Sequence, residues 1–206
     1  MISIVGYGSL LSEASARETI PGLTNFRVVT VPGYKRIFNK VGVVFISRHK
    51  ADPDSLQLAS CSTLPASECE IICSQFECTQ AEYEALFERE HRFNWVEVET
   101  FTDGQSETGL MCTGSTDQHY RYSKCRSEQE YHERVGQFYA GNLWRNDILP
   151  FPRYLSFCLK AAASQGEAVL NNFLDSSYLA DGETTIRTYL DNSGSNWREI
   201  DSAYHY

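Results

Sequence analysis

The sequence predicts an α+β domain built on one mixed or antiparallel sheet that can curl into a small barrel. The order of the predicted strands and helices, and the absence of regular alternation between them, predict this class. Strand-like segments fill the first two thirds of the 206 residues and helix-like segments follow, with no regular strand–helix alternation. A chain of this length also buries about 70% of its unfolded surface, so it can fold without disulfides or a metal. No repeat or linker divides residues 1–206, which we expect to form a single domain.

The expected strands are rich in β-branched and aromatic residues and lie between turn signals. They span residues 2–7, 26–32, 34–46, 56–64, 70–76, 93–101 and 108–114. Pro32-Gly33 is expected to form a turn between two of them, and Asp103-Gly104 a hairpin turn between the last two.

The expected helices begin at polar caps and repeat their apolar residues with helical spacing. Ser12 can cap a short helix over 13–18, and Thr79 can cap one that runs through His91. Longer helices are expected over 127–140 and 152–174. From about residue 175 we expect a helical C-terminal extension, and the polar segment after Asp191 is expected to pack loosely.

The charge and cysteine content exclude several classes of protein. A formal charge of −9 argues against a nucleic-acid-binding surface, and no apolar run is long enough for a membrane helix. The start of the chain lacks the features of a signal peptide, and the odd number of cysteines, seven, suits reduced thiols in the cytoplasm. Cys69, Cys73 and Cys78 lack the spacing of a zinc site and are expected to be buried structural thiols, so no metal is expected.

A short loop that joins the first strand to the first helix is the first candidate site. It consists of Gly6, Tyr7, Gly8, Ser9, Leu10 and Leu11. A strand end that runs through small residues into a helix exposes backbone N–H groups, which can bind a carboxylate or a developing oxyanion. The alternative is that Gly8 only forms a turn and Ser12 only caps the helix.

The second candidate is a carboxylate on the helix predicted to start at residue 80. At about 100° per residue, Tyr83, Leu86 and Phe87 form one apolar stripe, and Glu90 falls within it. A carboxyl group among apolar side chains loses hydration, an environment that tunes it for general acid–base catalysis. The alternative is that Glu90 turns to water or pairs with a neighbouring arginine. His91 lies about 100° away in helical phase and is expected on the surface.

Four segments resemble motifs of one protein family. They are residues 5–11, like a Tyr-Gly-Ser-[Asn/Leu] loop; 31–38, like a Gly-aromatic-basic-basic-x-Phe strand; 86–90, like Leu-x-x-x-Glu; and 150–154, like Pro-x-x-x-Tyr. Together they resemble the γ-glutamylcyclotransferase-like proteins, which include γ-glutamylamine cyclotransferases and the glutathione-specific ChaC type. The fold implied by this resemblance is a small mixed β-barrel with flanking helices. Leu10 stands where many members have Asn, which leans toward the ChaC-like branch.

The resemblance implies an enzyme without a metal or cofactor that acts on a small-molecule γ-glutamyl compound. The α-amine of the γ-glutamyl group would attack its own side-chain carbonyl and release 5-oxoproline and an amine. Glu90 would be the catalytic acid–base, loop residues 6–11 would bind substrate, and Tyr154 would lie at the substrate pocket. Glutathione, a γ-glutamyl amino acid and a γ-glutamylamine all remain possible substrates. The alternative is a non-catalytic binding or regulatory module on the same scaffold.

Overall fold

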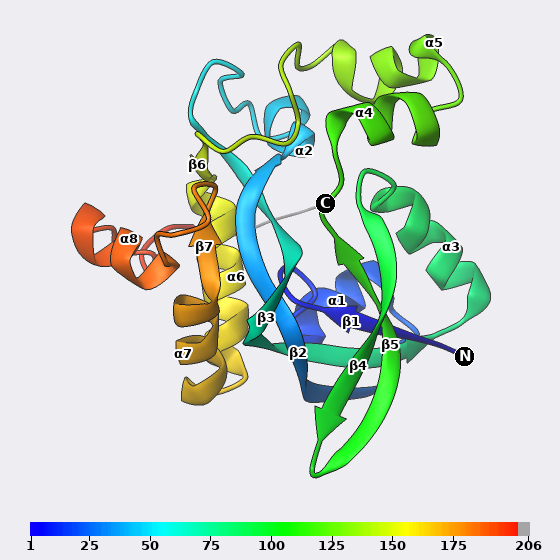
Figure 1. The fold of residues 1–206 in the computed structure, drawn as a ribbon, viewed down its shortest axis with the longest axis vertical. Helices are drawn as coiled ribbons and strands as arrows, with labels where there is room; N and C mark the ends of the chain where they lie inside the picture. The colour runs from blue at the N-terminus through cyan, green and yellow to red at the C-terminus, as the bar shows by residue number, and fades with distance from the viewer. Residues whose placement is uncertain (202–206) are drawn as a thin grey trace.

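Five strands close into a barrel in the computed structural model, which describes residues 1–201 (Figure 1). Around the barrel the strand order is β3-β1-β5-β4-β2, and β2 pairs again with β3. β1 and β5 are parallel, whereas the other neighbouring pairs are antiparallel, which confirms the mixed sheet. The bounds are β1 Ile2–Gly6, β2 Thr24–Val41, β3 Gln57–Cys78, β4 Asn94–Thr102 and β5 Gln105–Thr113. Two short strands pair in parallel with this sheet: β6 Leu149–Pro150 with β3, and β7 Ser177–Leu179 with β2.

The strands β2 and β3 are each continuous where the sequence predicted two shorter strands. At Pro32-Gly33 the chain does not turn back, because Gly33 adopts a left-handed φ of 77° and the register with β3 shifts by a bulge. A bulge bends a strand without ending its pairing. The predicted strand over 34–46 was too long, since β2 ends at Val41 and a short helix follows. The predicted Asp103-Gly104 hairpin turn is confirmed, with positive φ at both residues.

Helices surround the barrel on three sides. In Figure 1, α6, α7 and α8 lie along one side, α3 lies on the other, and α4 and α5 lie above the upper end. The helices are α1 Glu13–Thr19, α2 Val43–Ser47, α3 Gln80–Arg89, α4 Asp117–His119, α5 Glu128–Tyr131, α6 Pro152–Ser164, α7 Glu167–Ser176 and α8 Ile186–Ser193. Two π-helical turns, η1 Tyr120–Lys124 and η2 His132–Gly136, follow α4 and α5. The helix predicted over 152–174 is therefore two helices, separated at Gly166 by a φ of 113°.

Both predicted N-caps are present. The Ser12 side chain accepts a hydrogen bond from the N–H of Ser15 at the start of α1. At the start of α3, Thr79 and Glu82 form a reciprocal capping box, and Glu82 also accepts from the N–H of Gly22. The start of α3 is therefore fixed by its own cap and by a hydrogen bond from the segment that precedes β2.

The chain beyond Asp175 contains β7 as well as α8, and the segment after Asp191 is held more firmly than the sequence indicated. Trp197 is buried, and its carbonyl oxygen accepts a hydrogen bond of 2.7 Å from Ser156 Oγ on α6. Lys160, on the same helix, donates to the Ile200 carbonyl oxygen. The expectation of a loose tail was wrong for residues 192–201, because one large apolar side chain anchors an otherwise polar segment. The rest of the predicted tail, residues 202–206, lies outside the described residues.

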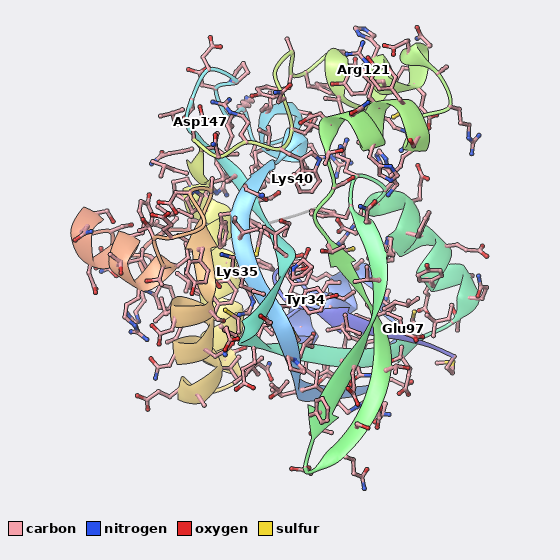
Figure 2. The ribbon with its side chains drawn as sticks, in the orientation of Figure 1. Tyr34, Lys35, Lys40, Glu97, Arg121 and Asp147 are labelled. Carbon is pink, nitrogen blue, oxygen red and sulfur yellow. The ribbon has the colours of Figure 1, made fainter. Side chains whose placement is uncertain are left out.

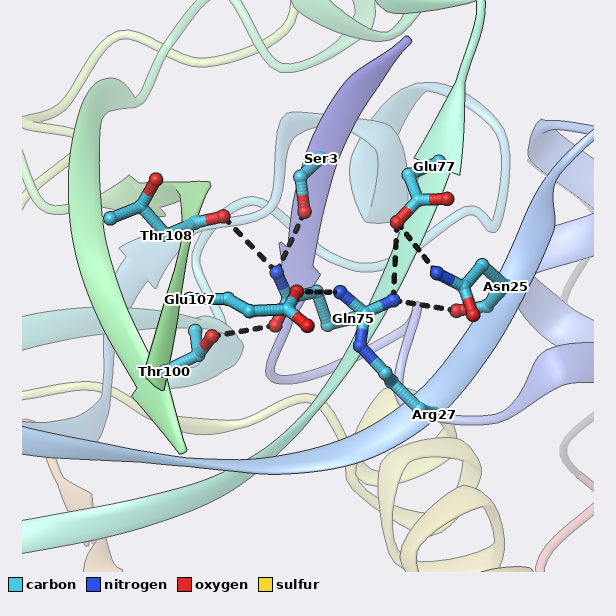
Figure 3. A network of polar contacts seen from close by, with 8 residues as sticks. All are labelled: Ser3, Asn25, Arg27, Gln75, Glu77, Thr100, Glu107 and Thr108. Atoms are coloured by element: carbon cyan, nitrogen blue, oxygen red, sulfur yellow. Dashed lines mark hydrogen bonds and ion pairs between the residues drawn. The ribbon is translucent and has the colours of Figure 1, made fainter. Parts of the chain in front are cut away.

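A buried glutamine connects four strands of the barrel (Figure 3). Gln75 of β3 is fully buried, and its Nε2 donates to Ser3 Oγ on β1 (2.7 Å) and to the Thr108 carbonyl oxygen on β5 (3.1 Å). Its Oε1 accepts from Thr100 Oγ1 on β4 at 2.7 Å. Because its amide nitrogen and oxygen are both satisfied, the network stabilises the closed barrel rather than costing unpaired buried groups.

Gln75→Ala should lower the free energy of unfolding by about 2 to 4 kcal/mol, because it leaves three polar partners unpaired and a void behind. The measurement is urea denaturation followed by circular dichroism. Gln105→Ala, on an exposed side chain of β5, is the matched control and should change stability by less than about 0.5 kcal/mol. Equal denaturation midpoints for the two variants would contradict the assigned network.

Candidate functional site

One cavity of about 640 Å³ brings together most of the residues that the sequence singled out. It lies between the loop after β1, the end of α3 and the start of α6. The predicted site residues on its wall are Gly6, Tyr7, Gly8, Ser9, Leu10, Glu90 and Tyr154. Leu11 is not on this wall, because its side chain is fully buried in the core. Segments more than 140 residues apart in the chain thus meet at one cavity.

Arg36, a fully buried residue of β2, holds the loop after β1 from the interior of the protein. Its Nε donates to the Tyr7 carbonyl oxygen at 2.8 Å, and one terminal nitrogen donates to Asn172 Oδ1 (3.3 Å) and Ser176 Oγ (3.0 Å) on α7. The other terminal nitrogen donates to the carbonyl oxygen of Ile72 on β3. Burial lowers the pKa of Arg36 from its usual value. One guanidinium thus joins the loop to β2, β3 and α7.

The return of the loop toward β3 requires a glycine. Ser74 Oγ donates to the carbonyl oxygens of Leu10 (2.7 Å) and Gly6 (3.2 Å), so the loop folds back over its own start. A Cβ atom at Gly6 would lie 2.6 Å from Leu10 Cβ and 2.7 Å from Ser74 Oγ. Any larger residue at position 6 would therefore displace the loop from the wall of the cavity.

The loop presents backbone N–H groups without intramolecular acceptors. A hydrogen bond from the Leu11 N–H to the Gly8 carbonyl oxygen closes a turn. Within residues 1–201, the N–H groups of Gly8, Ser9 and Leu10 donate to no protein acceptor. Buried N–H groups normally find partners, so a row of three beside a cavity is suited to an anionic ligand. The loop therefore contains the expected turn at Gly8 and also, within residues 1–201, three N–H donors without an acceptor.

Tyr154 lies directly against the loop on the cavity wall, and its place at a substrate pocket stays a prediction. It is buried near the start of α6, and a Cβ atom added to Gly8 would lie 3.0 Å from Tyr154 Oη. Tyr7 itself is buried in the core, and burial is the main cause that raises its pKa well above the usual value. The phenol of Tyr7 is therefore neutral at physiological pH.

Glu90 is the residue directly after α3, and its side chain is 20% exposed on the cavity wall. Its Oε1 accepts a hydrogen bond of 2.8 Å from Arg89 Nε and lies 2.7 Å from Arg89 Nη2. Within residues 1–201, its Oε2 accepts no hydrogen bond. The structure therefore combines the two alternatives from the sequence, since Glu90 faces the cavity and also pairs with a neighbouring arginine.

The apolar stripe used to orient α3 is only partly buried. Leu86 is 1% exposed, but Phe87 is 41% exposed and stacks on Trp95 of β4 at 6.1 Å between ring centroids. Tyr83 also packs edge-on against Trp95. The helix thus rests on the outer edge of the barrel through an aromatic cluster, and only its last turn reaches the cavity.

Sequence reasoning missed Lys40, which is only 5% exposed and lies on the cavity wall. Its Nζ is 4.7 Å from the centre of the Phe93 ring, and burial and the nearby Arg92 lower its pKa to about 7. The strand period does not single it out, because Ile37 is buried along with Arg36 and Phe38, and the register with β3 shifts between Phe38 and Lys40.

His91 was expected on the surface, and this was wrong. It is half-buried, lines the cavity and lies 5.3 Å from the Tyr120 ring. Burial, and then the positive charge of Arg92 and Arg134, lowers the pKa of His91 to about 2, so the imidazole is neutral at physiological pH. The helix ends at Arg89, so helical phase no longer applied at this residue.

Cys73 and Cys78 are buried as expected, whereas Cys69 is only partly buried. All seven are unpaired thiols, and six of them are buried. Among residues 1–201, no group of three or more His, Cys, Asp or Glu side chains is arranged to hold a metal ion. Within the same part of the chain, no helix combines the length and apolar character needed to span a membrane.

Comparisons with known proteins identify the fold. No family model matches the sequence, and no curated protein matches it. A solved γ-glutamyl cyclotransferase structure is similar over 83% of each chain, with 12% identity and a TM-score of 0.56. An uncharacterized human protein (13% identity, TM-score 0.55) covers 84% of this chain and 85% of its own. A glutathione-specific γ-glutamyl cyclotransferase from yeast (14%, 0.50) covers 83% of this chain and 94% of its own. The chain therefore has the γ-glutamyl cyclotransferase fold, which confirms the fold class implied by the sequence.

Arg36→Lys should lower the free energy of unfolding by about 2 to 4 kcal/mol, because an ammonium group cannot reproduce the fork of hydrogen bonds that holds Tyr7 and Ile72. Urea denaturation measures the change. Arg17→Lys, at an exposed arginine paired with Glu13, is the matched control with an expected change below about 0.5 kcal/mol.

A milder variant keeps this prediction testable if Arg36→Lys does not fold. Asn172→Ala removes an oxygen that accepts from Arg36 and from the Ile72 N–H, and should cost about 1 to 2 kcal/mol. If both variants were as stable as Arg17→Lys, the buried guanidinium would not be the fixed point of the loop.

Proposed function

We propose that the protein is a γ-glutamyl cyclotransferase that releases 5-oxoproline from a γ-glutamyl compound. One observation carries the proposal. Glu90 lines the same cavity as Gly8, Ser9 and Leu10, whose backbone N–H groups have no acceptor within residues 1–201. These are the two kinds of group that an intramolecular aminolysis needs, a proton acceptor and a site for negative charge. The similarity in fold to two solved γ-glutamyl cyclotransferases supports the same reaction class.

The loop after β1 would bind the negatively charged part of the reacting group. Its three N–H groups can donate to the α-carboxylate of the γ-glutamyl group or to the oxyanion that forms at its side-chain carbonyl. Tyr154, whose hydroxyl lies beside Gly8, would border the same position. Because Arg36 and Ser74 hold the loop in place, these donors do not need to reorganise when substrate binds.

The proposed reaction moves two protons through Glu90. Glu90 accepts a proton from the α-ammonium group, and the resulting amine attacks the γ-carbonyl carbon. The new carbon–nitrogen bond closes a five-membered ring and leaves a positively charged ring nitrogen and an oxyanion. Glu90 gives its proton to the leaving nitrogen as the bond from the carbonyl carbon to that nitrogen breaks, and it then takes the second proton from the ring nitrogen. The released amine takes up that second proton, so Glu90 returns to its carboxylate form. The products are 5-oxoproline and an amine. Holding the glutamyl chain folded accounts for much of the acceleration, since both reacting groups belong to one molecule.

The ion pair with Arg89 is compatible with this role. Both contacts from Arg89 go to Oε1 of Glu90, whereas Oε2 is unengaged within residues 1–201. Arg89 also donates to Thr19 Oγ1 at the end of α1, so the arginine and the carboxylate that it holds are tied to a second helix. Glu90 would therefore meet a substrate amine through Oε2 while Oε1 keeps its orientation.

Glu90→Gln should lower kcat for 5-oxoproline formation by about 10²- to 10⁴-fold, because an amide cannot accept and return the proton. The assay is product analysis with glutathione, γ-glutamyl-alanine and γ-glutamyl-lysine as substrates. Glu84→Gln is the matched control, because it makes the same chemical change on the exposed side of α3, where Glu84 accepts a hydrogen bond from Gln80. This variant should keep full activity.

Two outcomes would oppose the proposal. Absence of 5-oxoproline from every compound with folded wild-type protein would favour a non-catalytic binding module on this scaffold. Formation of 5-oxoproline at the wild-type rate by Glu90→Gln would leave cyclotransferase activity but remove Glu90 as its acid–base.

A further inference from the structure

The cavity carries more positive than negative side chains, although the whole protein has a formal charge of −9. Two of its acids are matched by arginines on the same wall, Glu90 by Arg89 and Glu88 by Arg134. The remaining charged side chains on the wall are Glu18, Lys40, Arg48 and Arg92. Three of these four are cations, so the cavity is an electropositive depression in an acidic protein, an arrangement that attracts anions.

Lys40 is the least solvated of these cations. It is 5% exposed, and within residues 1–201 its Nζ pairs with no carboxylate. Its contacts are a long hydrogen bond of 3.4 Å to the Val41 carbonyl oxygen and the Phe93 ring at 4.7 Å. Buried charges in proteins are normally paired, because desolvation without a counterion is costly. An ammonium group held in this way beside a cavity lacks an anion that a ligand can supply.

Arg92 adds a second cation at the same place. Its Nη2 donates to the Arg134 carbonyl oxygen, but its buried Nε has no hydrogen-bond partner within residues 1–201. Arg92 directly precedes Phe93, whose ring lies 4.7 Å from Lys40 Nζ, and after burial the charge of Arg92 is the largest cause that lowers the pKa of Lys40. His91 also lines this wall, and after burial the nearby cations, Arg92 first among them, lower its pKa.

We propose that Lys40 and Arg92 form an anion subsite for a carboxylate on the leaving group, so that the preferred substrates are γ-glutamyl compounds of amino acids or peptides rather than γ-glutamylamines. This inference rests on the proposed cyclotransferase function and adds the substrate class. Lys40 and Arg92 are specificity-determining residues in it, while Glu90 and the loop act on the glutamyl part.

Lys40 and the loop after β1 meet the cavity at different positions along β2. Arg36 contacts the loop through Tyr7, whereas Lys40 lies four residues farther along the same strand, beyond a register shift between Phe38 and Lys40. The loop N–H groups are assigned to the negative charge of the glutamyl part. The cations Lys40 and Arg92 on the same wall are then available for a second carboxylate, which the leaving group of a γ-glutamyl amino acid or peptide carries.

The experiment compares two substrates that differ in one group. γ-Glutamyl-alanine carries a carboxylate on its leaving group, and γ-glutamyl-alaninamide carries a neutral amide at the same place. We expect wild-type protein to have a kcat/KM for the carboxylate about 10- to 100-fold higher, as hydrogen bonds to charged groups allow, with most of the difference in KM. This comparison uses only unmodified protein.

Lys40→Met should remove most of this preference. The kcat/KM for γ-glutamyl-alanine should fall at least about tenfold, and that for the alaninamide compound should fall much less. Arg92→Gln should act in the same direction and provides a second test if Lys40→Met does not fold. Lys35→Met is the matched control, because it removes the same charge from another position of β2 (Figure 2). Lys35 contacts the Gly182 carbonyl oxygen and the Tyr178 ring, and it does not line the cavity.

The outcomes separate this inference from the proposed function. If neither compound yields 5-oxoproline and the wider panel also fails, the cyclotransferase function itself is wrong. If both compounds react with equal kcat/KM, the function stands and the anion subsite is overturned. Equal losses on both substrates in Lys40→Met would place Lys40 at the glutamyl part and would likewise overturn the subsite.

Discussion

The buried guanidinium of Arg36 is the constraint on which the cavity depends. A cation without a carboxylate partner can stay in the interior only if its hydrogen bonds are satisfied together, and here these come from the loop after β1, from β3 and from α7. Displacing any of these elements would leave a buried donor unpaired. Phe173 adds a ring 4.7 Å from the guanidinium carbon. The loop is therefore held rigidly although it has no regular secondary structure.

The long strands β2 and β3 explain how one small barrel can present groups at separate points of a cavity. β2 places Arg36 against the loop and Lys40 four residues farther along the strand on the cavity wall, with Phe38 between them in the core. Its register with β3 shifts at Gly33 and again between Phe38 and Lys40, and neither shift ends the strand. Because Ile37 is buried as well, the placement of Lys40 depends on tertiary packing rather than on a strict two-residue period. The continuity of β2 through both shifts keeps the loop contact and the buried lysine on one strand.

Local rules predicted the parts of the structure that local hydrogen bonds determine. The cap at Thr79 and the hairpin turn at Asp103-Gly104 follow from short-range chemistry and were predicted correctly. Glu90 was also placed at the cavity, although the apolar stripe behind that argument is only partly buried. Failures occurred where tertiary packing overrides propensity: in the two long strands, in the break at Gly166, and in the tail anchored by Trp197. Lys40 was overlooked because lysine is rarely buried and because a register shift directly before it interrupts the strand alternation.

In the proposed subsite, binding of a carboxylate is coupled to protonation of Lys40. In the absence of ligand, burial and Arg92 hold the pKa of Lys40 at about 7, while Glu90 and Cys112 act in the opposite direction. A carboxylate bound in the proposed subsite adds a further negative charge beside the amine and raises its pKa above that of the empty cavity. Binding near neutral pH then takes up a proton, and by linkage the affinity for the anion falls as pH rises above 7. The desolvation that makes the buried lysine costly on its own is the same condition that strengthens its interaction with a bound anion, because few water molecules compete for the ammonium group.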